Sequence, residues 1–207
     1  MTIVGLDFDG IMHDSCKYAH AAFCETLRGH GLPGIAMHTL RAHFGSDWSH
    51  FFNATGVPQE LHGIWKDEYQ KRYDNQPIGP LIPGTRELLD HILTKHGRRG
   101  LMLITNEQPE RVHRFFAENN IETLESAVRC AYSGKVRLLE EHGVTDYVGD
   151  TIGDGEACIA AANRPRFIGV AHPPGYNLPE MLYTFKAEHP EHRIDVVQSL
   201  FEAKVLL

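Results

Sequence analysis

The sequence has few of the features that mark secreted or membrane-bound proteins. It contains four cysteines in 207 residues, and no two of them form a CxxC pair. Disulfide-stapled scaffolds are short and dense in cysteine, so we expect reduced thiols at Cys16, Cys24, Cys130 and Cys158. No charged leader with a long apolar segment opens the chain, and no apolar run approaches the ~20 residues of a membrane span. We therefore expect a cytoplasmic protein without a membrane partner.

Positive charge and zinc motifs are also scarce. The 20 Lys and Arg residues are outnumbered by 27 Asp and Glu residues, which gives a net charge of −7. Without a cationic excess to displace counterions, nucleic acid is excluded as the main partner, whereas a small phosphorylated metabolite needs only local positive charge. The 14 histidines include no HExxH motif, so we interpret them as structural or surface residues rather than zinc ligands.

Short apolar runs alternate with amphipathic stretches in much of the chain. The runs predict buried strands at residues 3–8, 100–105, 127–131, 146–150 and 166–171. Helical spacing between the later runs predicts covering helices. This alternation indicates an α/β fold with an open, Rossmann-like parallel sheet and helices on both faces.

One long interval interrupts that rhythm. Between the first two predicted strands, the sequence shows no strand pattern and has helical spacing at residues 15–31, 37–45, 47–56 and 58–75. The interval closes on "QPIGPLIPGT", in which three prolines and two glycines indicate an extended connector. We predict a sheet domain of residues 1–13 and 84–207 and a helical insertion of residues 14–83. Its connectors are expected near Ile11–Asp14 and Gln76–Gly84.

Polar residues stand where the predicted strands end. The carboxyl ends of parallel strands meet at one edge of a sheet, where ligands bind in such folds. That edge would collect seven residues: Asp7, Asp9, Thr105, Asn106, Lys135, Asp150 and Asp154. Clustered carboxylates are hard oxygen ligands that suit Mg²⁺ better than zinc. A divalent cation, a lysine and amide donors together favour phosphoryl transfer.

These residues carry a family resemblance. "DFDGI", "LITN", "SGK" and "VGDTIGD", in this order, resemble the four signature motifs of the haloacid dehalogenase (HAD) superfamily. The insertion after the first motif is similar to the α-helical cap domain of its phosphoglycolate-phosphatase-like branch. The resemblance implies a HAD-like core of residues 1–13 and 84–207 and a cap of residues 14–83.

The resemblance also implies roles for the acids. Asp7 would be the nucleophile that forms an aspartyl-phosphate, and Asp9 would be the general acid and then the general base. Mg²⁺ would be bound by Asp7, by Asp150 and by the main-chain carbonyl of Asp9. Asp154 would orient a metal-bound water or Lys135.

The remaining assignments concern phosphate and the substrate's leaving group. Thr105, Asn106 and Lys135 would hold the phosphoryl oxygens, and Lys135 would also neutralise charge beside the nucleophile. The segment from Lys135 to Asp150 is short for the family, which makes Lys135 the assignment with the weakest spacing. In the cap, Arg41 is the candidate for substrate specificity, and a solvated helix face is the competing interpretation of that residue.

Several simpler interpretations stay open at this point. Taken alone, Asp7 and Asp9 could be turn residues, and Thr105 and Asn106 could cap a helix. Asp154 could cap the helix that follows it, and this role is compatible with a role in the site.

The function that the sequence favours is a Mg²⁺-dependent phosphatase that acts on a small phosphomonoester, as a monomer or homodimer. A phosphosugar mutase of the same superfamily would use the same acids. A catalytically silent regulatory module is a further alternative, although the expected nucleophile and metal acids are all present. A dehalogenase is disfavoured, because that chemistry has no leaving oxygen for Asp9 to protonate.

Overall fold

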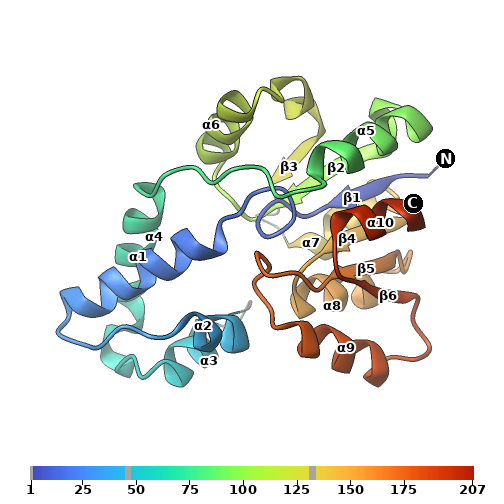
Figure 1. Ribbon diagram of the computed structural model, residues 1–207. Coiled ribbons are helices and arrows are strands. Elements are labelled where there is room, and N and C mark those ends of the chain that lie inside the picture. The colour runs from blue at the N-terminus through green and yellow to red at the C-terminus, as the bar shows by residue number, and fades with distance from the viewer. Residues whose placement is uncertain (1, 45–47, 131–133) are drawn as a thin grey trace.

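A computed structural model describes residues 2–44, 48–130 and 134–207 of the chain (Figure 1). These residues form a six-stranded parallel sheet in the order β3-β2-β1-β4-β5-β6. The strands are β1 Val4–Leu6, β2 Leu101–Thr105, β3 Val128–Cys130, β4 Asp146–Gly149, β5 Arg166–Val170 and β6 Ile194–Val197. The predicted α/β class with a Rossmann-like parallel core is confirmed.

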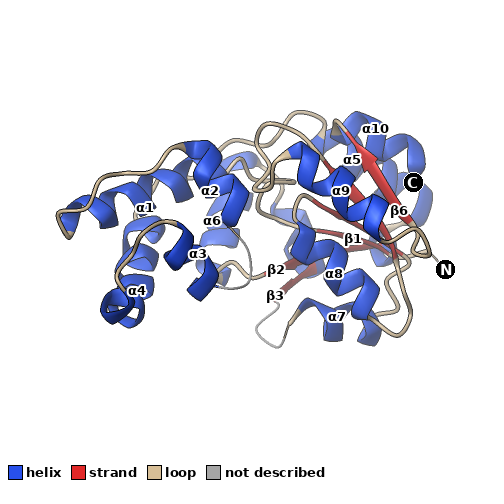
Figure 2. Cartoon of the chain, turned by 90° about the horizontal axis from the view of Figure 1, so that it is seen from below, coloured by secondary structure: helices blue, strands red, loops and turns tan. Residues whose placement is uncertain are grey.

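Helices cover both faces of the sheet (Figure 2). Along β2, Leu101 and Leu103 pack on one face while Met102 and Ile104 pack on the other, as the two-residue period of a strand requires. Three helices cover the first face, namely α5 Thr85–His96, α6 Pro109–Asn119 and α10 Leu200–Leu206. Three cover the second, namely α7 Lys135–Glu141, α8 Ile152–Ala160 and α9 Pro179–Glu188. Short 3₁₀ turns lie at η1 Gln59–Leu61, η2 Arg98–Gly100 and η3 Glu122–Ala127.

The described part of the insertion is helical and stands to one side of the sheet (Figure 1). Its helices are α1 Cys16–Gly29, α2 Met37–His43, α3 Trp48–Ala54 and α4 His62–Asp74. They share a hydrophobic cluster in which Phe51, Phe52 and Trp65 are buried, as expected of core residues. Tyr176, from the loop after β5, completes that cluster. The division into a core domain and a cap domain stays a prediction.

Three predicted elements and one motif extend into residues outside the description. Residues 45–47 include an end of two predicted helices, and residues 131–133 include the end of the predicted third strand and Ser133 of "SGK". Within the described residues, the five predicted strands are present, each at most a few residues shorter than expected. The sixth strand, β6, was not predicted. It is four residues long, carries Asp195 at its centre and lies at the sheet edge, so its hydrophobic signal is weak.

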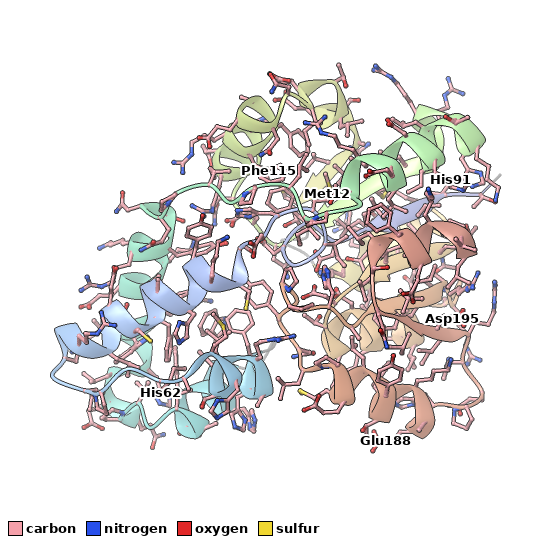
Figure 3. The ribbon with its side chains drawn as sticks, viewed as in Figure 1. Met12, His62, His91, Phe115, Glu188 and Asp195 are labelled. Atoms are coloured by element: carbon pink, nitrogen blue, oxygen red, sulfur yellow. The ribbon has the colours of Figure 1, made fainter. Side chains whose placement is uncertain are left out.

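The two connectors of the insertion contact each other. The N–H of Ile82 donates to the carbonyl of Met12 over 3.0 Å, and His13 forms an isolated antiparallel bridge with Leu81. Figure 3 shows Met12 beside Phe115 of α6, and both belong to the core cluster under the first face. The start and the end of the insertion are therefore anchored at one place in the core.

Among the described residues, no helix has the length and hydrophobicity that a membrane span needs. All four cysteines are free, as predicted; three are buried and Cys130 is partly exposed.

Candidate active site

The acids of the first and fourth motifs meet where the strand order reverses. β1 lies between β2 and β4, so Asp7 after β1 and Asp150 after β4 face the same point of the sheet edge. The N–H of Asp7 donates to the carbonyl of Val148 over 2.9 Å, which extends the β1–β4 pairing to Asp7. Gly10 has a φ of 76°, and a Cβ there would lie 2.2 Å from Oδ2 of Asp150. Only glycine allows the loop after β1 to lie against that acid.

Three carboxylates and one ammonium group form the centre of the site. Asp7, Asp150 and Asp154 are buried, and each offers an oxygen within 4.8 Å of the others. Lys135 Nζ donates to Asp154 Oδ1 over 2.6 Å and lies 2.9 Å from Asp7 Oδ2. The other oxygen of Asp7 accepts the N–H of Phe8 over 2.8 Å. Both oxygens of Asp7 are thus held in place by the chain itself.

The donor set fits a magnesium ion. Asp150 Oδ1 is buried and has no hydrogen-bond partner among the described residues, while Oδ2 accepts the N–H of Tyr176. A buried carboxylate oxygen without a partner is costly unless a cation takes that place. The group consists of oxygen ligands alone, which are the ligands that Mg²⁺ prefers.

The electrostatics of the cluster also call for positive charge. Burial and the neighbouring Asp154 raise the pKa of Asp7 to about 8, and Lys135 only partly opposes them. Burial raises the pKa of Asp150 well above its ordinary value, and Asp154 and Asp7 add to this effect. Burial works to lower the pKa of Lys135, but the carboxylates of Asp154 and Asp7 raise it well above its ordinary range. One lysine is too little charge for three buried acids, and a divalent cation would stabilise their ionised forms.

Asp9 stands apart from this group in its contacts. Its side chain is 25% exposed, and its Oδ1 lies 3.1 Å from Nδ1 of His13. The hydroxyl of Tyr73, on α4, donates to the same oxygen over 3.4 Å. Burial works to raise the pKa of Asp9, but hydrogen bonds from His13 and Ser15 outweigh it and hold that pKa below its ordinary value.

The two residues of the second motif differ in exposure. Thr105 is buried at the end of β2, and its hydroxyl oxygen accepts the N–H of Glu107 over 2.9 Å. Asn106 is exposed at the turn that follows. The alternative interpretation as helix caps is wrong, because α6 begins only at Pro109 and its N-cap residue is Gln108. Both residues therefore remain available to a ligand at the sheet edge.

Asp154 has the two roles that the sequence left open. With Thr151 it forms a reciprocal capping box at the start of α8, where its Oδ2 accepts the N–H of Thr151 over 3.1 Å. Its Oδ1 holds Lys135. The capping box at the start of α8 holds the carboxylate of Asp154 in place, and this carboxylate in turn positions Lys135.

Arg41 lies at the border between α2 and the sheet domain. Its Nη2 donates to the carbonyls of Asn177 over 2.8 Å and of His172 over 3.2 Å. Its Nε is buried and has no partner among the described residues. Arg41 therefore anchors a core loop and keeps one N–H unpaired.

That loop, residues 172–177, was missed by sequence reasoning. The Nε2–H of His172 donates to the carbonyl of Gly10 over 2.6 Å, and the Oδ1 of Asn177 accepts the N–H of Ile152 over 2.7 Å. Tyr176 adds the N–H that reaches Asp150. The signal was available, since "HPPGYN" follows a predicted strand at the same edge of the sheet.

A second missed feature is a buried ion pair between Arg111 of α6 and Glu107, which precedes that helix. Arg111 Nε lies 3.3 Å from Glu107 Oε2, and both side chains are 4% exposed. The Arg111 guanidinium lies 4.3 Å from the ring centre of Tyr73, and it donates to the carbonyls of Tyr73, Gln76 and Pro77 over 3.1–3.3 Å. This arginine fastens the second connector to the core beside Asp9.

The chain was compared with protein-family models, curated proteins and solved structures. A family model described as haloacid dehalogenase-like hydrolase matches residues 4–135. Among solved structures, the chain is similar to a haloacid dehalogenase-like family hydrolase from Streptococcus pneumoniae, with a TM-score of 0.75, 17% identity, and coverage of 100% of this chain and 98% of that one. It is similar to a predicted phosphoglycolate phosphatase from Haemophilus somnus, with a TM-score of 0.69, 17% identity, and coverage of 100% and 97%.

A protein from Bacteroides vulgatus, provisionally described as a β-phosphoglucomutase, is also similar, with a TM-score of 0.68, 13% identity, and coverage of 99% and 86%. A search of curated proteins found no match. At these identities the structural likeness shows a shared fold.

Proposed function

Since this chain belongs to the haloacid dehalogenase-like hydrolases, we propose that it is a Mg²⁺-dependent phosphatase that acts on a small phosphomonoester. The observation that carries the proposal is the buried group of Asp7, Asp150 and Asp154 with Lys135 bound to two of them. This group combines a fixed carboxylate nucleophile with ligands for a cation, at the sheet edge where α/β folds bind ligands.

In the proposed first step, an oxygen of Asp7 attacks phosphorus, and the bond from phosphorus to the leaving oxygen breaks. Asp9 gives that oxygen its proton. In the free protein the pKa of Asp9 is low, and the negative charge of a bound phosphoryl group beside it works to raise that pKa. In the second step, Asp9 takes a proton from water, whose oxygen attacks phosphorus and releases inorganic phosphate and free Asp7.

The other residues hold charge and orientation in this scheme. Lys135 neutralises the oxygens between nucleophile and phosphate, and Thr105 and Asn106 offer a hydroxyl and an amide to the phosphoryl group. Mg²⁺, held by the side chains of Asp7 and Asp150 and by the carbonyl of Asp9, would supply the remaining neutralisation of the transferred group.

We propose that residues 14–83 act as a cap that opens and closes over Asp7 on the two connectors. An aspartyl-phosphate must be shielded from stray water, yet substrate and product must pass. Two contacts support this role, since Tyr73 of α4 reaches Asp9 and Arg41 of α2 reaches the loop after β5. Arg41 would then contribute to substrate specificity through the leaving group. The four free cysteines suit the cytoplasm as the place of action.

A phosphosugar mutase is the second candidate, because the same acids would serve it and one solved structure of this fold is described in those terms. A silent regulatory module fits the site less well, since the nucleophile and the metal acids are assembled in one buried group.

The test is a panel of phosphomonoesters assayed with Mg²⁺, including p-nitrophenyl phosphate, phosphoglycolate, sugar phosphates and nucleoside monophosphates. We expect release of inorganic phosphate with a clear preference in kcat/KM for one class. Asp7→Asn should lower this turnover by at least ~10³-fold while the protein stays folded, because a carboxamide cannot form the acyl-phosphate.

Metal dependence belongs to the same assay. A chelator should abolish turnover, Mg²⁺ should restore it, and Ca²⁺ should inhibit because it takes more ligands at longer distances. Isomerised product without phosphate release would favour the mutase. No turnover of any kind on the panel, or full turnover by Asp7→Asn, would overturn the phosphatase.

A further inference from the structure

His13 occupies an unusual place between the general acid and the second connector. It lies in the loop after β1, is fully buried, and packs between the rings of Phe8 and Phe115 at centroid distances of 5.3 and 5.0 Å. Its Nδ1 lies 3.1 Å from Asp9 Oδ1, and its Nε2 lies 2.9 Å from the backbone nitrogen of Gly79. The imidazole thus bridges two segments that are 66 residues apart in the chain.

The partners of the ring fix its tautomer. A backbone N–H can only donate, so Nε2 of His13 must accept the N–H of Gly79 and carries no proton. In the neutral imidazole the proton then sits on Nδ1, which donates to Asp9 Oδ1. Each ring nitrogen therefore has one defined role.

The connector is shaped to make this contact. A Cβ at position 79 would lie 2.5 Å from the carbonyl oxygen of Asp14 and 3.0 Å from two atoms of the His13 ring. A side chain at that position would push the connector off the imidazole. Gly79 is thus required for the close approach, and the approach gives Nε2 its donor.

We propose that His13 is a positioning residue for Asp9: it is held in the Nδ1–H tautomer by the N–H of Gly79 and fixes the carboxyl group that protonates the leaving oxygen. Oδ1 of Asp9 accepts from Nδ1–H and from the hydroxyl of Tyr73, so these two donors fix the orientation of the carboxyl group. The bridge also makes the alignment of Asp9 depend on the position of the connector. This inference rests on the proposed phosphatase.

Two substitutions separate the two ends of the ring. The amide nitrogen of an asparagine can occupy the position of Nδ1, so His13→Asn keeps a donor to Asp9 and loses the acceptor for Gly79. The amide of a glutamine reaches the position of Nε2 instead, so His13→Gln keeps the acceptor and loses the donor to Asp9.

The readout is the dependence of kcat/KM on the leaving group. An alkyl phosphate needs a proton on its leaving oxygen, whereas p-nitrophenolate leaves without one, so a misplaced general acid harms only the first. The ratio kcat/KM covers the steps up to transfer to Asp7, so slow hydrolysis of the intermediate does not mask the effect.

We expect His13→Gln to lose roughly 10–100-fold on an alkyl phosphate and less than about threefold on p-nitrophenyl phosphate. The first loss is smaller than the ~10²–10⁴-fold that general acid catalysis contributes, because Asp9 itself is still present. His13→Asn should return the leaving-group dependence toward that of the wild type. Equal losses on both substrates, or the same profile for both variants, would overturn the proposal.

A matched control is His62→Gln. His62 lies in the helical insertion, away from the sheet edge (Figure 3), where its Nε2–H donates to the carbonyl of Val57 over 3.0 Å. The substitution removes a partly buried histidine that has a backbone hydrogen bond but does not touch Asp9, so both substrates should be turned over as by the wild type.

A second measurement needs no variant activity. The ¹⁵N chemical shifts of the His13 ring, assigned by the signal that disappears in His13→Asn, report the tautomer directly. A proton on Nδ1 and none on Nε2 is expected, and a proton on Nε2 would contradict the bridge.

The outcomes also separate this inference from the proposed function. If the wild type turns over phosphomonoesters and Asp7→Asn does not, a uniform loss in His13→Gln overturns the role of His13 alone. If the wild type turns over none of them, both proposals fail together.

Discussion

Two sets of charged side chains meet at this site, and the chain holds them in opposite ways. Asp7, Asp150 and Asp154 are buried against one lysine, and an oxygen of Asp150 has no partner among the described residues. Arg41 and Arg111, at the border with helices α1 to α4, donate instead to backbone carbonyls of a loop and a connector.

The difference shows which charges are left for a ligand. The acids lack enough positive charge of their own, and in the proposed function a divalent cation supplies it. The two arginines donate to backbone carbonyls, so they fix the geometry of the segments around the acids. If this contrast is correct, removing one of the acids should raise the stability of the metal-free protein. Removing a buried arginine should lower it.

The largest effect should come from Asp7 in metal-free protein. Its pKa is about 8 in the fold against 3.8 ordinarily, so the folded state binds a proton that the unfolded state has already lost between these pH values. Stability of the metal-free wild type should therefore fall as pH rises from about 4 to about 8. Asp7→Asn lacks this contribution and should be the more stable protein at pH 8.

Thermal unfolding in chelator at pH 4 and at pH 8 measures this difference. The two proteins should melt at similar temperatures at pH 4, and Asp7→Asn should melt several degrees higher at pH 8. Mg²⁺ should stabilise the wild type at pH 8 and the variant much less. Equal stability of the wild type and Asp7→Asn at pH 8 would mean that Lys135 alone compensates the charge of Asp7. The acids would then be as fully paired as the arginines.

Arg111→Met should act in the opposite direction. It removes three carbonyl contacts from the second connector and leaves Glu107 buried without its partner. Breaking one side of such a pair costs about 3–5 kcal/mol in other proteins. Here we expect about 2–4 kcal/mol less free energy of unfolding in urea, because burial and Asp9 raise the pKa of Glu107 to about 8 and allow it to take up a proton.

The chain offers a matched control on the same helix. Arg114 donates to the carbonyl of Gln76 over 3.1 Å but is exposed and pairs with exposed Glu118. Arg114→Met should therefore cost less than about 1 kcal/mol. Adding Glu107→Gln to Arg111→Met should recover part of the loss, since it removes the unpaired carboxylate. Similar costs for both arginine variants would show that burial does not distinguish them.

These contrasts also mark what the sequence can predict. Asp7 and Asp150 follow short apolar runs, and the rule that parallel strands share a carboxyl edge brings them together without any knowledge of side-chain packing. Lys135 opens a predicted helix and is found at that helix start, beside Asp7 and Asp154. Local signals and one topological rule were sufficient for five of the six strands and for the acid cluster.

The missed residues depend on pairing between distant segments. Arg111 donates to carbonyls of residues that lie 34–38 positions away in the chain. His13 accepts an N–H from a residue 66 positions away. No local pattern encodes such contacts. His13 did stand four residues after Asp9, but interpreting all histidines as one class hid that spacing. β6 was missed because a short edge strand with a central charge has little apolar signal.

The smallest effect should come from substitution of Arg41. Its contacts fit both an anchor of the backbone and a contact to the substrate. Nη2 is engaged with the loop after β5, as an anchor would be, whereas Nε is buried without a recorded partner, as a substrate contact would be in the free protein. We expect Arg41→Ala to lower kcat/KM about tenfold on the preferred phosphomonoester, close to the lower end of the ~1.5–3 kcal/mol that a hydrogen bond to a charged group contributes. Loss on p-nitrophenyl phosphate should be smaller, because a contact with the leaving group cannot matter to a substrate that lacks that group. Anchoring of the loop alone would lower both values alike, since the N–H of Tyr176 on Asp150 serves every substrate. Equal losses would therefore place Arg41 with Arg111 among the residues that only hold the backbone.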